Sequence, residues 1–496
     1  MGFREMVENL GLSGRGAMDA EIRDVTCDSR EAGPGCAFVA LRGETSDGAA
    51  FIPKALGQGA VAVLADRWVD GLPPELPFAL LDHPREQMAV MARMVQGSPD
   101  EGLALLGVTG TNGKTTTTML IRQLLQGAGQ GCGLIGTVLL AAGQEEREAT
   151  RTSPESPVFY RWIRKALDAG DRAMAVEVSS HALSLARVHG ARFRVGLFTN
   201  LTQDHLDFHG DLESYFQAKA RLFDQCGRGL VNVDDPYGMR LLAEAPGLLG
   251  FGSAPTAAYR MEELTLSPTG TRFRMVSPGG TREIRSPLLG RFNAYNLLGA
   301  LAVCVEAGFD LDALVGAVPG LKGAPGRLDR VDCGQPFGVM VDYAHTPDAL
   351  EKLLAAGKDL LPPGGRLHVL FGCGGDRDRS KRAPMAAAVA RGADLIWHTS
   401  DNSRSEDPGQ ILEDAALGIS EAIRNSGRYH RIQDRALAVE AALAACRPGD
   451  LLLLAGKGHE AYQEIQGRKF PYSDRAAVEA VLAGRSVPRP WAEAIH

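Results

Sequence analysis

The sequence lacks the features that mark several common classes of protein. No apolar stretch approaches the roughly 18 residues that a membrane-spanning helix needs, and the first ten residues, MGFREMVENL, contain no apolar core of a signal peptide. The eight cysteines are scattered without a CxxC pair, which argues against a disulfide framework or a zinc site. These absences predict a cytoplasmic protein with no membrane span.

The composition also lacks extremes of charge. Lysine and arginine number 53 against 60 aspartates and glutamates, a net charge of −7, so we expect no general nucleic-acid binding. Glycine is abundant, 59 of 496 residues, but follows no Gly-X-Y period, which excludes collagen and predicts many tight turns. At roughly 150 residues per domain, the length predicts about three domains.

Two glycine- and proline-rich segments, 97–102 and 322–327, divide the chain. They predict domains at residues 1–98, 99–330 and 331–496. Short apolar runs alternate with helical patterns, a rhythm typical of an α/β fold with largely parallel sheets. The expected strands include residues 36–41, 60–64, 78–81, 103–108, 173–178, 195–198, 229–233, 338–342, 367–371, 395–399 and 451–455.

A glycine-rich segment follows the run 103–108 and precedes an expected helix at 119–126. It consists of Gly110, Thr111, Asn112, Gly113, Lys114, Thr115 and Thr116. Such glycines let backbone N–H groups turn toward phosphate, while the lysine supplies charge and a threonine hydroxyl can bind magnesium. Val108 stands where the standard pattern has glycine, and a turn without phosphate contacts is the alternative. The strand–loop–helix order predicts a central P-loop-type, parallel-sheet ATPase domain.

Carboxylate and imidazole side chains end two further runs of the central domain. Glu177 and His181 belong to the first, and Asp204 and His205 to the second. Since ligands bind beyond the carboxyl ends of parallel strands, both pairs should face the phosphate-binding loop and could hold a second cation. Each pair alone is equally explained by capping or local hydrogen bonding. Lys219 lies in an amphipathic helix pattern, which by itself predicts a solvent-exposed lysine.

Three loops of the third domain carry opposite charges. They are 371–378 (FGCGGDRD), 401–404 (DNSR) and 456–460 (GKGHE), each after an expected strand. Arginine binds carboxylates and glutamate binds ammonium, so we expect a zwitterionic ligand. Surface loops with capping aspartate and asparagine are the alternative. The alternation of strands and helices here predicts a Rossmann-like domain.

In order and spacing, these segments resemble the Mur ligase family. The matching segments are GTNGKTTTT, EVSSHAL, NLTQDHLDFHG, Lys219, GRFNAYN, PGRLDRV, VDYAHTPDAL, FGCGGDRDRSKR, DNSRSEDP and GKGHE. They cover the second and third domains. In the first domain, the DSR of residues 28–30 and the FVALRG of residues 38–43 resemble the part of the family that holds a uridine nucleotide. Within the family, the likeness is to members that add the third residue of the peptidoglycan peptide.

The resemblance implies an ATP-dependent, amide-bond-forming ligase. ATP would phosphorylate the free carboxylate of UDP-N-acetylmuramoyl-L-Ala-D-Glu, and the amine of meso-diaminopimelate would attack the acyl phosphate. It further implies ATP and Mg²⁺ as cofactors, a monomer, and a role in cytoplasmic peptidoglycan synthesis, and with it in cell shape and division.

The resemblance also assigns roles to particular residues. The implied catalytic residues are Lys114, Lys219, Glu177 and His205, and the implied metal ligands are Thr115, Glu177, His205 and Lys219 as a CO₂-derived carbamate. The implied ATP contacts are residues 110–116 together with Asn293, Asn296, Arg327 and Asp342. The implied contacts to the UDP-N-acetylmuramoyl dipeptide are Cys27, Ser29, Glu44, Thr45, Ser46, Thr152, Ser153, Ser180 and Arg187. The implied diaminopimelate contacts are Arg377, Asp401, Asn402, Ser403, Arg404, Gly456 and Glu460.

The amino acid that is added depends on Arg404. In the family, this arginine pairs with the distal carboxylate of diaminopimelate, which lysine lacks, so Arg404 favours diaminopimelate. Ser403 replaces the proline of the family's Asn-Pro-Arg signature. The alternatives are the same ligase with L-lysine, a related ligase such as folylpolyglutamate synthase, and a nucleotide-dependent ATPase or switch that forms no bond.

Overall fold

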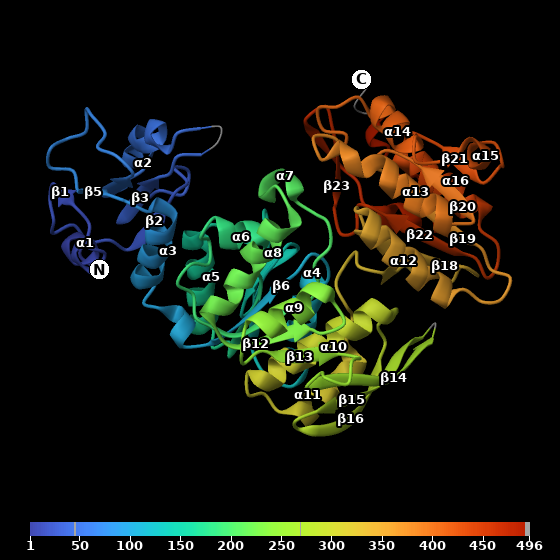
Figure 1. Ribbon diagram of the computed structural model, residues 1–496. Helices are drawn as coiled ribbons and strands as arrows, with labels where there is room; N and C mark the ends of the chain where they lie inside the picture. Colours follow the sequence, from blue (N-terminus) through green and yellow to red (C-terminus); the bar gives the residue numbers. More distant parts are fainter. Residues whose placement is uncertain (44–45, 268, 492–496) are drawn as a thin grey trace.

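The computed structural model describes residues 1–43, 46–267 and 269–491. The chain forms three lobes in sequence order, each built on its own sheet (Figure 1). The N-terminal lobe is blue in that view, the central lobe runs from teal to yellow, and the C-terminal lobe is orange to red.

The N-terminal lobe is a small, mostly parallel sheet with helices beside it. Its strands, in spatial order, are β1 (Gly14–Arg15), β5 (Phe78–Leu80), β4 (Ala62–Ala65), β3 (Cys36–Ala40) and β2 (Asp24–Thr26). Its helices are α1 (Phe3–Asn9), α2 (Ile52–Gly57) and α3 (Pro84–Val95), with a 3₁₀ turn at Gly48–Phe51, and a further 3₁₀ turn at Pro99–Glu101 leads into the central lobe. Only β1 pairs in the antiparallel sense.

The central lobe is a larger sheet whose middle strands are parallel. In spatial order they are β16 (Gly280–Ser286), β15 (Gly270–Ser277), β14 (Tyr259–Ser267), β13 (Leu249–Gly252), β12 (Cys226–Asn232), β11 (Phe193–Phe198), β6 (Ala104–Thr109), β10 (Ala173–Glu177), β7 (Cys132–Ile135), β8 (Leu139–Ala142) and β9 (Glu145–Glu148). The helices are α4 (Lys114–Gly127), α5 (Ser156–Asp168), α6 (Ser180–Ser184), α7 (Leu206–His209), α8 (Leu212–Ala220), α9 (Pro236–Glu244), α10 (Arg291–Glu306) and α11 (Leu311–Ala317), with 3₁₀ turns at Arg221–Gln225 and Val318–Gly320.

The C-terminal lobe has a third sheet, which is parallel except at β17. Its spatial order is β17 (Asp329–Arg330), β18 (Gly338–Asp342), β22 (Leu451–Ala455), β19 (Leu367–Phe371), β20 (Leu395–His398) and β21 (Tyr429–Arg431), with a separate hairpin of β23 (Tyr462–Ile465) and β24 (Arg468–Pro471). Its helices are α12 (Pro347–Leu360), α13 (Arg382–Gly392), α14 (Pro408–Ala416), α15 (Glu421–Arg424), α16 (Arg435–Ala445) and α17 (Asp474–Leu482), with a 3₁₀ turn at Arg379–Lys381.

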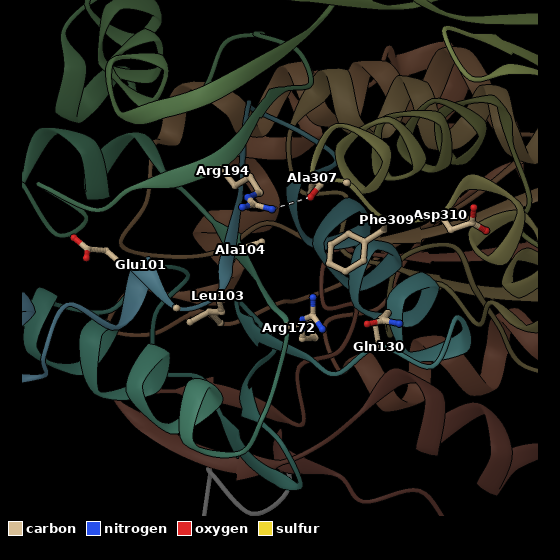
Figure 2. Close-up of a pocket in the computed structure, with 11 residues that line it drawn as sticks. Glu101, Leu103, Ala104, Gln130, Arg172, Arg194, Ala307, Phe309 and Asp310 are labelled. Atoms are coloured by element: carbon tan, nitrogen blue, oxygen red, sulfur yellow. Dashed lines mark hydrogen bonds between the residues drawn. The ribbon is translucent and has the colours of Figure 1, made fainter.

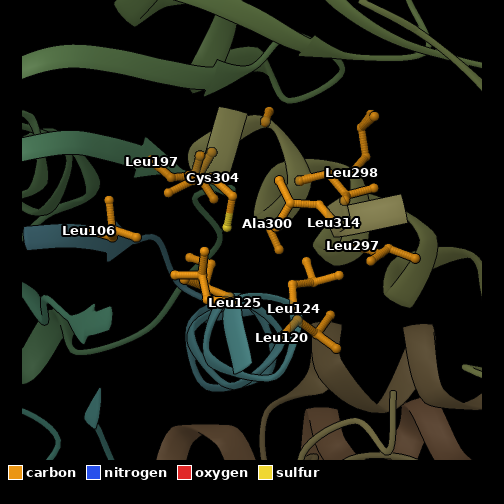
Figure 3. Packing of buried hydrophobic residues seen from close by; sticks show 14 of the residues in the cluster. Leu106, Leu120, Leu124, Leu125, Leu197, Leu297, Leu298, Ala300, Cys304 and Leu314 are labelled. Atoms are coloured by element: carbon orange, nitrogen blue, oxygen red, sulfur yellow. The ribbon is translucent and has the colours of Figure 1, made fainter. Parts of the chain in front are cut away.

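Buried strands explain why so many apolar runs are continuous. Alternate residues of a strand point to opposite faces, and in β6 Leu106 packs with α4, α10 and α11 while Leu105 packs with α3 and α5. Figure 3 shows the first of these faces, where Leu120 and Leu124 of α4 meet Leu297 of α10. Helices therefore cover both faces of the sheet, and its loops are left to form the sites at its edges.

The predicted α/β fold with parallel sheets is confirmed. The predicted strands 338–342, 367–371 and 451–455 match β18, β19 and β22. β17 lies before residue 331, the predicted start of the third domain, and pairs with β18 of the C-terminal lobe. We therefore propose a boundary just before Asp329. Within the described ranges, no helix is long and apolar enough to cross a membrane.

Candidate active site

The predicted loops lie at the carboxyl ends of neighbouring parallel strands. In the central lobe, β11, β6 and β10 are adjacent, so the loops after them meet at one edge of the sheet. In the C-terminal lobe, β22, β19 and β20 are adjacent, and the three charged loops follow them. Such an edge is where open α/β sheets bind their ligands.

The glycine-rich loop is braced by the loop after β11. Gly110 has φ +141°, and a Cβ there would lie 2.0 Å from Thr199 Oγ1, so only glycine fits. The Thr199 hydroxyl donates to the Asn112 carbonyl at 2.6 Å, and the Asn112 N–H donates to Asn200 Oδ1 at 2.9 Å. Helix α4 begins at Lys114, so its free N–H groups open on this loop, as a phosphate site requires.

A half-buried lysine and a buried one share one acceptor in this loop. Lys114 Nζ donates to the carbonyls of Gly110 at 2.9 Å and Thr111 at 2.8 Å, and Lys219 Nζ donates to Gly110 O at 2.7 Å. Lys219 is 1% exposed, so the exposed lysine expected from the helix pattern alone is wrong. Burial, reinforced by the charge of Lys114, lowers the pKa of Lys219 well below its usual value.

The predicted metal ligands lie around these lysines. The Thr115 hydroxyl donates to Glu177 Oε2 at 2.9 Å, and the N–H of Thr137 donates to Glu177 Oε1 at 2.7 Å. His205 follows β11, and burial lowers its pKa to about 4, which leaves a neutral imidazole near pH 7. Among the described residues, no three His, Cys, Asp or Glu side chains form a metal-binding group by themselves. A cation here would need the Thr115 hydroxyl or a modified Lys219 as well.

The predicted contacts to the UDP-linked substrate gather beside Glu177. Ser153 donates to the Glu177 carbonyl at 2.8 Å, Arg187 donates to the Ser153 carbonyl at 3.1 Å, and Thr137 donates to the Thr152 hydroxyl at 3.0 Å. Ser180 Oγ lies 2.9 Å from His209 Nε2. Ser180 and Ser153 are buried, so their hydroxyls are fixed in this position.

The N-terminal lobe supplies the remaining residues of that group. Cys27 is half-buried, and burial together with the charge of Glu155 raises the pKa of its thiol to about 12. Ser29 is buried and Ser46 is exposed. Glu44 and Thr45, also predicted to contact this substrate, lie outside the described residues.

A cavity of about 410 Å³ opens beside the glycine-rich loop and extends to the C-terminal lobe. Six predicted nucleotide-binding residues line it, Asn112, Gly113, Thr116, Asn296, Arg327 and Asp342. Asn293 is not part of this lining; it is buried and donates to the Leu289 carbonyl at 2.9 Å. Phe292 and Tyr295 from α10 and Lys352 from α12, which sequence reasoning missed, complete an apolar and charged wall suited to a nucleotide.

The three charged loops of the C-terminal lobe are interlocked. Arg404 donates to the Gly375 carbonyl at 2.6 Å and lies 3.8 Å from Glu464. Asn402 Nδ2 donates to Glu460 Oε2 at 2.9 Å. The three loops therefore contact one another, and predicted residues of the 401–404 and 456–460 loops meet directly.

The other predicted residues of this group differ in exposure. Asp401 and Ser403 are buried, Gly456 is buried beside them, and Arg377 is exposed. Sequence reasoning did not select Lys457, which is fully buried and donates to Asn402 Oδ1 at 3.1 Å. Its place in the GKGHE segment was the one available signal.

Two side chains of the C-terminal lobe form hydrogen bonds to the glycine-rich edge of the central lobe. Asp348 of α12 accepts from Asn112 Nδ2 at 3.0 Å and from the Thr202 hydroxyl at 3.2 Å. Lys381 donates to Asp204 Oδ1 at 2.7 Å. Neither Asp348 nor Lys381 was among the predicted residues, because nothing in the local sequence shows which distant side chain each one meets.

A second hollow, of about 460 Å³, lies at the opposite edge of the central sheet (Figure 2). It is lined by Leu103 and Ala104 at the start of β6, and by Arg194, which donates to the Ala307 carbonyl at 3.1 Å. None of the predicted site residues lines it. The candidate active site is therefore the edge that carries the loops.

Together, the fold and the site define an α/β protein with a phosphate-binding loop, a nucleotide-sized cavity and a separate pocket of opposite charges. Comparison with known proteins gives the family. Residues 21–76 match the Mur ligase family catalytic domain, residues 108–304 the Mur ligase middle domain, and residues 326–458 the Mur ligase glutamate ligase domain.

Individual relatives match over nearly the whole chain. A protein from Geobacillus kaustophilus named UDP-N-acetylmuramoyl-L-alanyl-D-glutamate–2,6-diaminopimelate ligase is 41% identical over 476 residues, which cover 94% of this chain and 96% of the relative. A protein of the same name from Geobacter metallireducens is 42% identical over 489 residues, 94% of this chain and 95% of the relative. A solved structure of a ligase of that name superimposes with a TM-score of 0.69 at 33% identity, covering 98% of this chain and 99% of that one. The chain belongs to the Mur ligase family.

Proposed function

We propose that this protein is the ATP-dependent ligase that joins meso-diaminopimelate to UDP-N-acetylmuramoyl-L-Ala-D-Glu. Relatives that carry this name match at 41–42% identity over 94% of the chain. The observation that carries the proposal is the Lys381–Asp204 ion pair of 2.7 Å. Because it links the amino-acid loops of one lobe to the glycine-rich edge of another, an activated carboxylate and an attacking amine can meet there.

The bond forms in two steps. The γ-phosphoryl group of ATP passes to the substrate carboxylate, and ADP leaves. The amine of diaminopimelate then attacks the acyl carbon, and the tetrahedral intermediate expels phosphate as the amide forms. Phosphoryl transfer depends mainly on positioning and charge neutralisation, for which Lys114 and the N–H groups at the start of α4 are placed beside the loop.

The residues around Glu177 fit magnesium. Mg²⁺ prefers oxygen ligands and keeps several waters, so the Thr115 hydroxyl and the Glu177 carboxylate suit it. The neutral imidazole of His205 would add one nitrogen donor. Bound there, Mg²⁺ would neutralise charge on the phosphates.

Lys219 would complete this ligand set as a carbamate. Its amine is buried, forms no ion pair among the described residues, and has a lowered pKa. A neutral amine can attack CO₂, with an N–C bond formed and a proton released. The product is an anion that suits a cation between Thr115 and His205.

The other predicted contacts form three groups. Asn293, Asn296, Arg327 and Asp342 would hold ATP, of which the last three line the cavity. Cys27, Ser29, Glu44, Thr45, Ser46, Thr152, Ser153, Ser180 and Arg187 would hold the UDP-linked dipeptide. Arg377, Asp401, Asn402, Ser403, Arg404, Gly456 and Glu460 would hold diaminopimelate.

Arg404 supports diaminopimelate over L-lysine. Its guanidinium is 22% exposed, donates to a backbone carbonyl, and lies 3.8 Å from Glu464. A distal carboxylate would add a strong partner, whereas a lysine side chain would bring a second cation to the same place. We also propose that the enzyme acts as a monomer in the cytoplasm.

The test is phosphate release from ATP with UDP-N-acetylmuramoyl-L-Ala-D-Glu present. We expect release to require meso-diaminopimelate, with a tripeptide product of the matching mass. Release with L-lysine and not diaminopimelate would reverse the specificity. Release without any amino acid would instead indicate an ATPase.

A further inference from the structure

Lys457 places a fully buried ammonium between two of the amino-acid loops. Its side chain is 0% exposed, and its Nζ lies 3.0 Å from Glu460 Oε2, 3.1 Å from Asn402 Oδ1 and 3.5 Å from Asp401 Oδ1. Buried cations are costly unless they are paired and hydrogen-bonded. This pairing therefore fixes the relative positions of the 401–404 and 456–460 loops.

The two carboxylate oxygens of Glu460 differ in their hydrogen-bond partners. Its Oε2 accepts from both Lys457 Nζ and Asn402 Nδ2, at 3.0 and 2.9 Å. Its Oε1 accepts from none of the described residues, and the side chain is 17% exposed. One oxygen is therefore held, and the other is oriented and available to an incoming donor.

Asp401 also interacts with Lys457, at a longer distance than Glu460 does, 3.5 Å against 3.0 Å. Burial alone would raise the pKa of Asp401, but Lys457 and Arg435 together hold it below its usual value. Asp401 also accepts from the Asn402 N–H at 2.7 Å. Lys457 is the one cation paired with Glu460 among the described residues, whereas Asp401 also has Arg435, so loss of Lys457 should leave Glu460 without a cationic partner.

We propose that Lys457 is a positioning residue that orients Glu460 Oε1 toward the distal ammonium of the diamino acid. This inference rests on the proposed function. It makes Lys457 a determinant of the preference for amino acids that carry that ammonium, acting through Glu460 rather than on the reacting atoms.

The test compares meso-diaminopimelate with 2-aminopimelate, which has the same chain and distal carboxylate but no distal amine. We expect Lys457→Met to reduce the preference for diaminopimelate, as a ratio of kcat/KM values, by about 10-fold or more. The change should come through the KM for diaminopimelate, with the KM values for ATP and the UDP-linked substrate unchanged. Glu460→Gln should lower the same preference, and the double variant should lower it no further.

Lys469→Met is the matched control. Lys469 is exposed and lies over the ring of Tyr462 at 4.1 Å, a ring that Lys457 also approaches at 5.8 Å. The preference of the Lys469→Met variant for diaminopimelate over 2-aminopimelate should equal that of the unmodified protein. ADP binding reports whether Lys457→Met is folded, and Lys457→Gln, which keeps an N–H donor, takes its place if it is not.

An equal loss of kcat/KM for both amino acids would overturn the proposal, because it would show a structural role only. So would an unchanged preference in a variant that binds ADP. Failure of the proposed function is separate: the unmodified protein would then release no phosphate in response to diaminopimelate.

Discussion

At the scale of single residues, two lysines contact the same carbonyl of the glycine-rich loop. Lys114 and Lys219 both donate to the Gly110 carbonyl, although neutralising phosphate needs only one of them at that point. Lys219 also lies 4.4 Å from the ring of Tyr215, inside the lobe. Burial of the Lys219 amine has a function if the amine is converted to an anionic carbamate. A cation beside Lys114 would repel magnesium, whereas an anion there would bind it.

Lys219→Ala should therefore lower turnover by about 100-fold or more, since the substitution removes a ligand of the magnesium ion that would neutralise the reacting phosphate. Added formate or acetate should restore part of the activity by filling the same place. Phosphate release measures both effects, and ADP binding shows that the variant is folded. Retained turnover, or a folded variant that no small carboxylate rescues, would count against the carbamate.

Arg404→Met should change the choice of amino acid. The distal carboxylate of diaminopimelate loses its partner, so its KM should rise by about 10-fold or more, while any use of L-lysine should not worsen. Steady-state phosphate release with each amino acid measures this. Arg391→Met is the control, because Arg391 is 65% exposed and pairs with Glu351 away from the loops. Equal effects of the two substitutions would contradict the assignment.

The position of Arg404 could be predicted from the sequence, but the burial of Lys219 could not. Arg404 stands in a short polar segment directly after a strand, so its place at the sheet edge follows from local order. The helix pattern around Lys219 shows which residues share a face, but not that the loop at Gly110, more than 100 positions earlier, covers that face. Long-range contacts of this kind also place Asp348 and Lys381.

At the scale of elements, strands were easier to predict than helix starts. β18, β19 and β22 are almost entirely buried, so each is a short, mostly apolar run with clear ends. Helix α4 begins at Lys114, five residues before the predicted start at residue 119. The sequence does not show the earlier start because four threonines, which favour strands, occupy the first turns of the helix. The two-residue edge strand β17 has no periodicity to detect.

The segment between the central and C-terminal lobes depends on Gly326. It has φ +66°, and a Cβ there would lie 2.1 Å from the backbone N of His459 and 2.3 Å from the backbone C of Gly458. Backbone of the connecting segment thus packs directly on the 456–460 loop. The neighbouring Arg327, which lines the nucleotide cavity, is thereby coupled to the amino-acid loops.

Gly326→Ala should lower the thermal midpoint of the C-terminal lobe by about 4–12 °C, because backbone must move as well as adopt a strained φ. Gly364→Ala is the matched control: Gly364 has φ +87° with nothing within 4 Å of a Cβ, so only the strain of a left-handed residue remains, roughly 2–4 °C. Calorimetry measures both. Equal shifts would show that the close approach to Gly458 has no energetic weight.

At the scale of the whole molecule, the predicted substrate contacts are divided among the lobes. The predicted contacts to the UDP-linked substrate come from the N-terminal and central lobes, and those to the amino acid come from the C-terminal lobe. The nucleotide cavity is lined by both the central and the C-terminal lobes. Closure of the lobes on one another is then part of nucleotide binding, and the contacts of Asp348 and Lys381 should contribute to ATP affinity.

Replacing both residues tests this coupling. Asp348→Ala with Lys381→Met removes the partners of Asn112, Thr202 and Asp204, so the KM for ATP should rise by about 5-fold or more. Small-angle scattering should show a larger radius of gyration. Glu351→Ala is the control. Glu351 also lies on α12, and its loss removes only an exposed ion pair within the C-terminal lobe, so neither the KM for ATP nor the radius of gyration should change. If the double variant keeps both the KM for ATP and the scattering of the unmodified protein, these contacts do not hold the lobes together, and the nucleotide cavity forms without them.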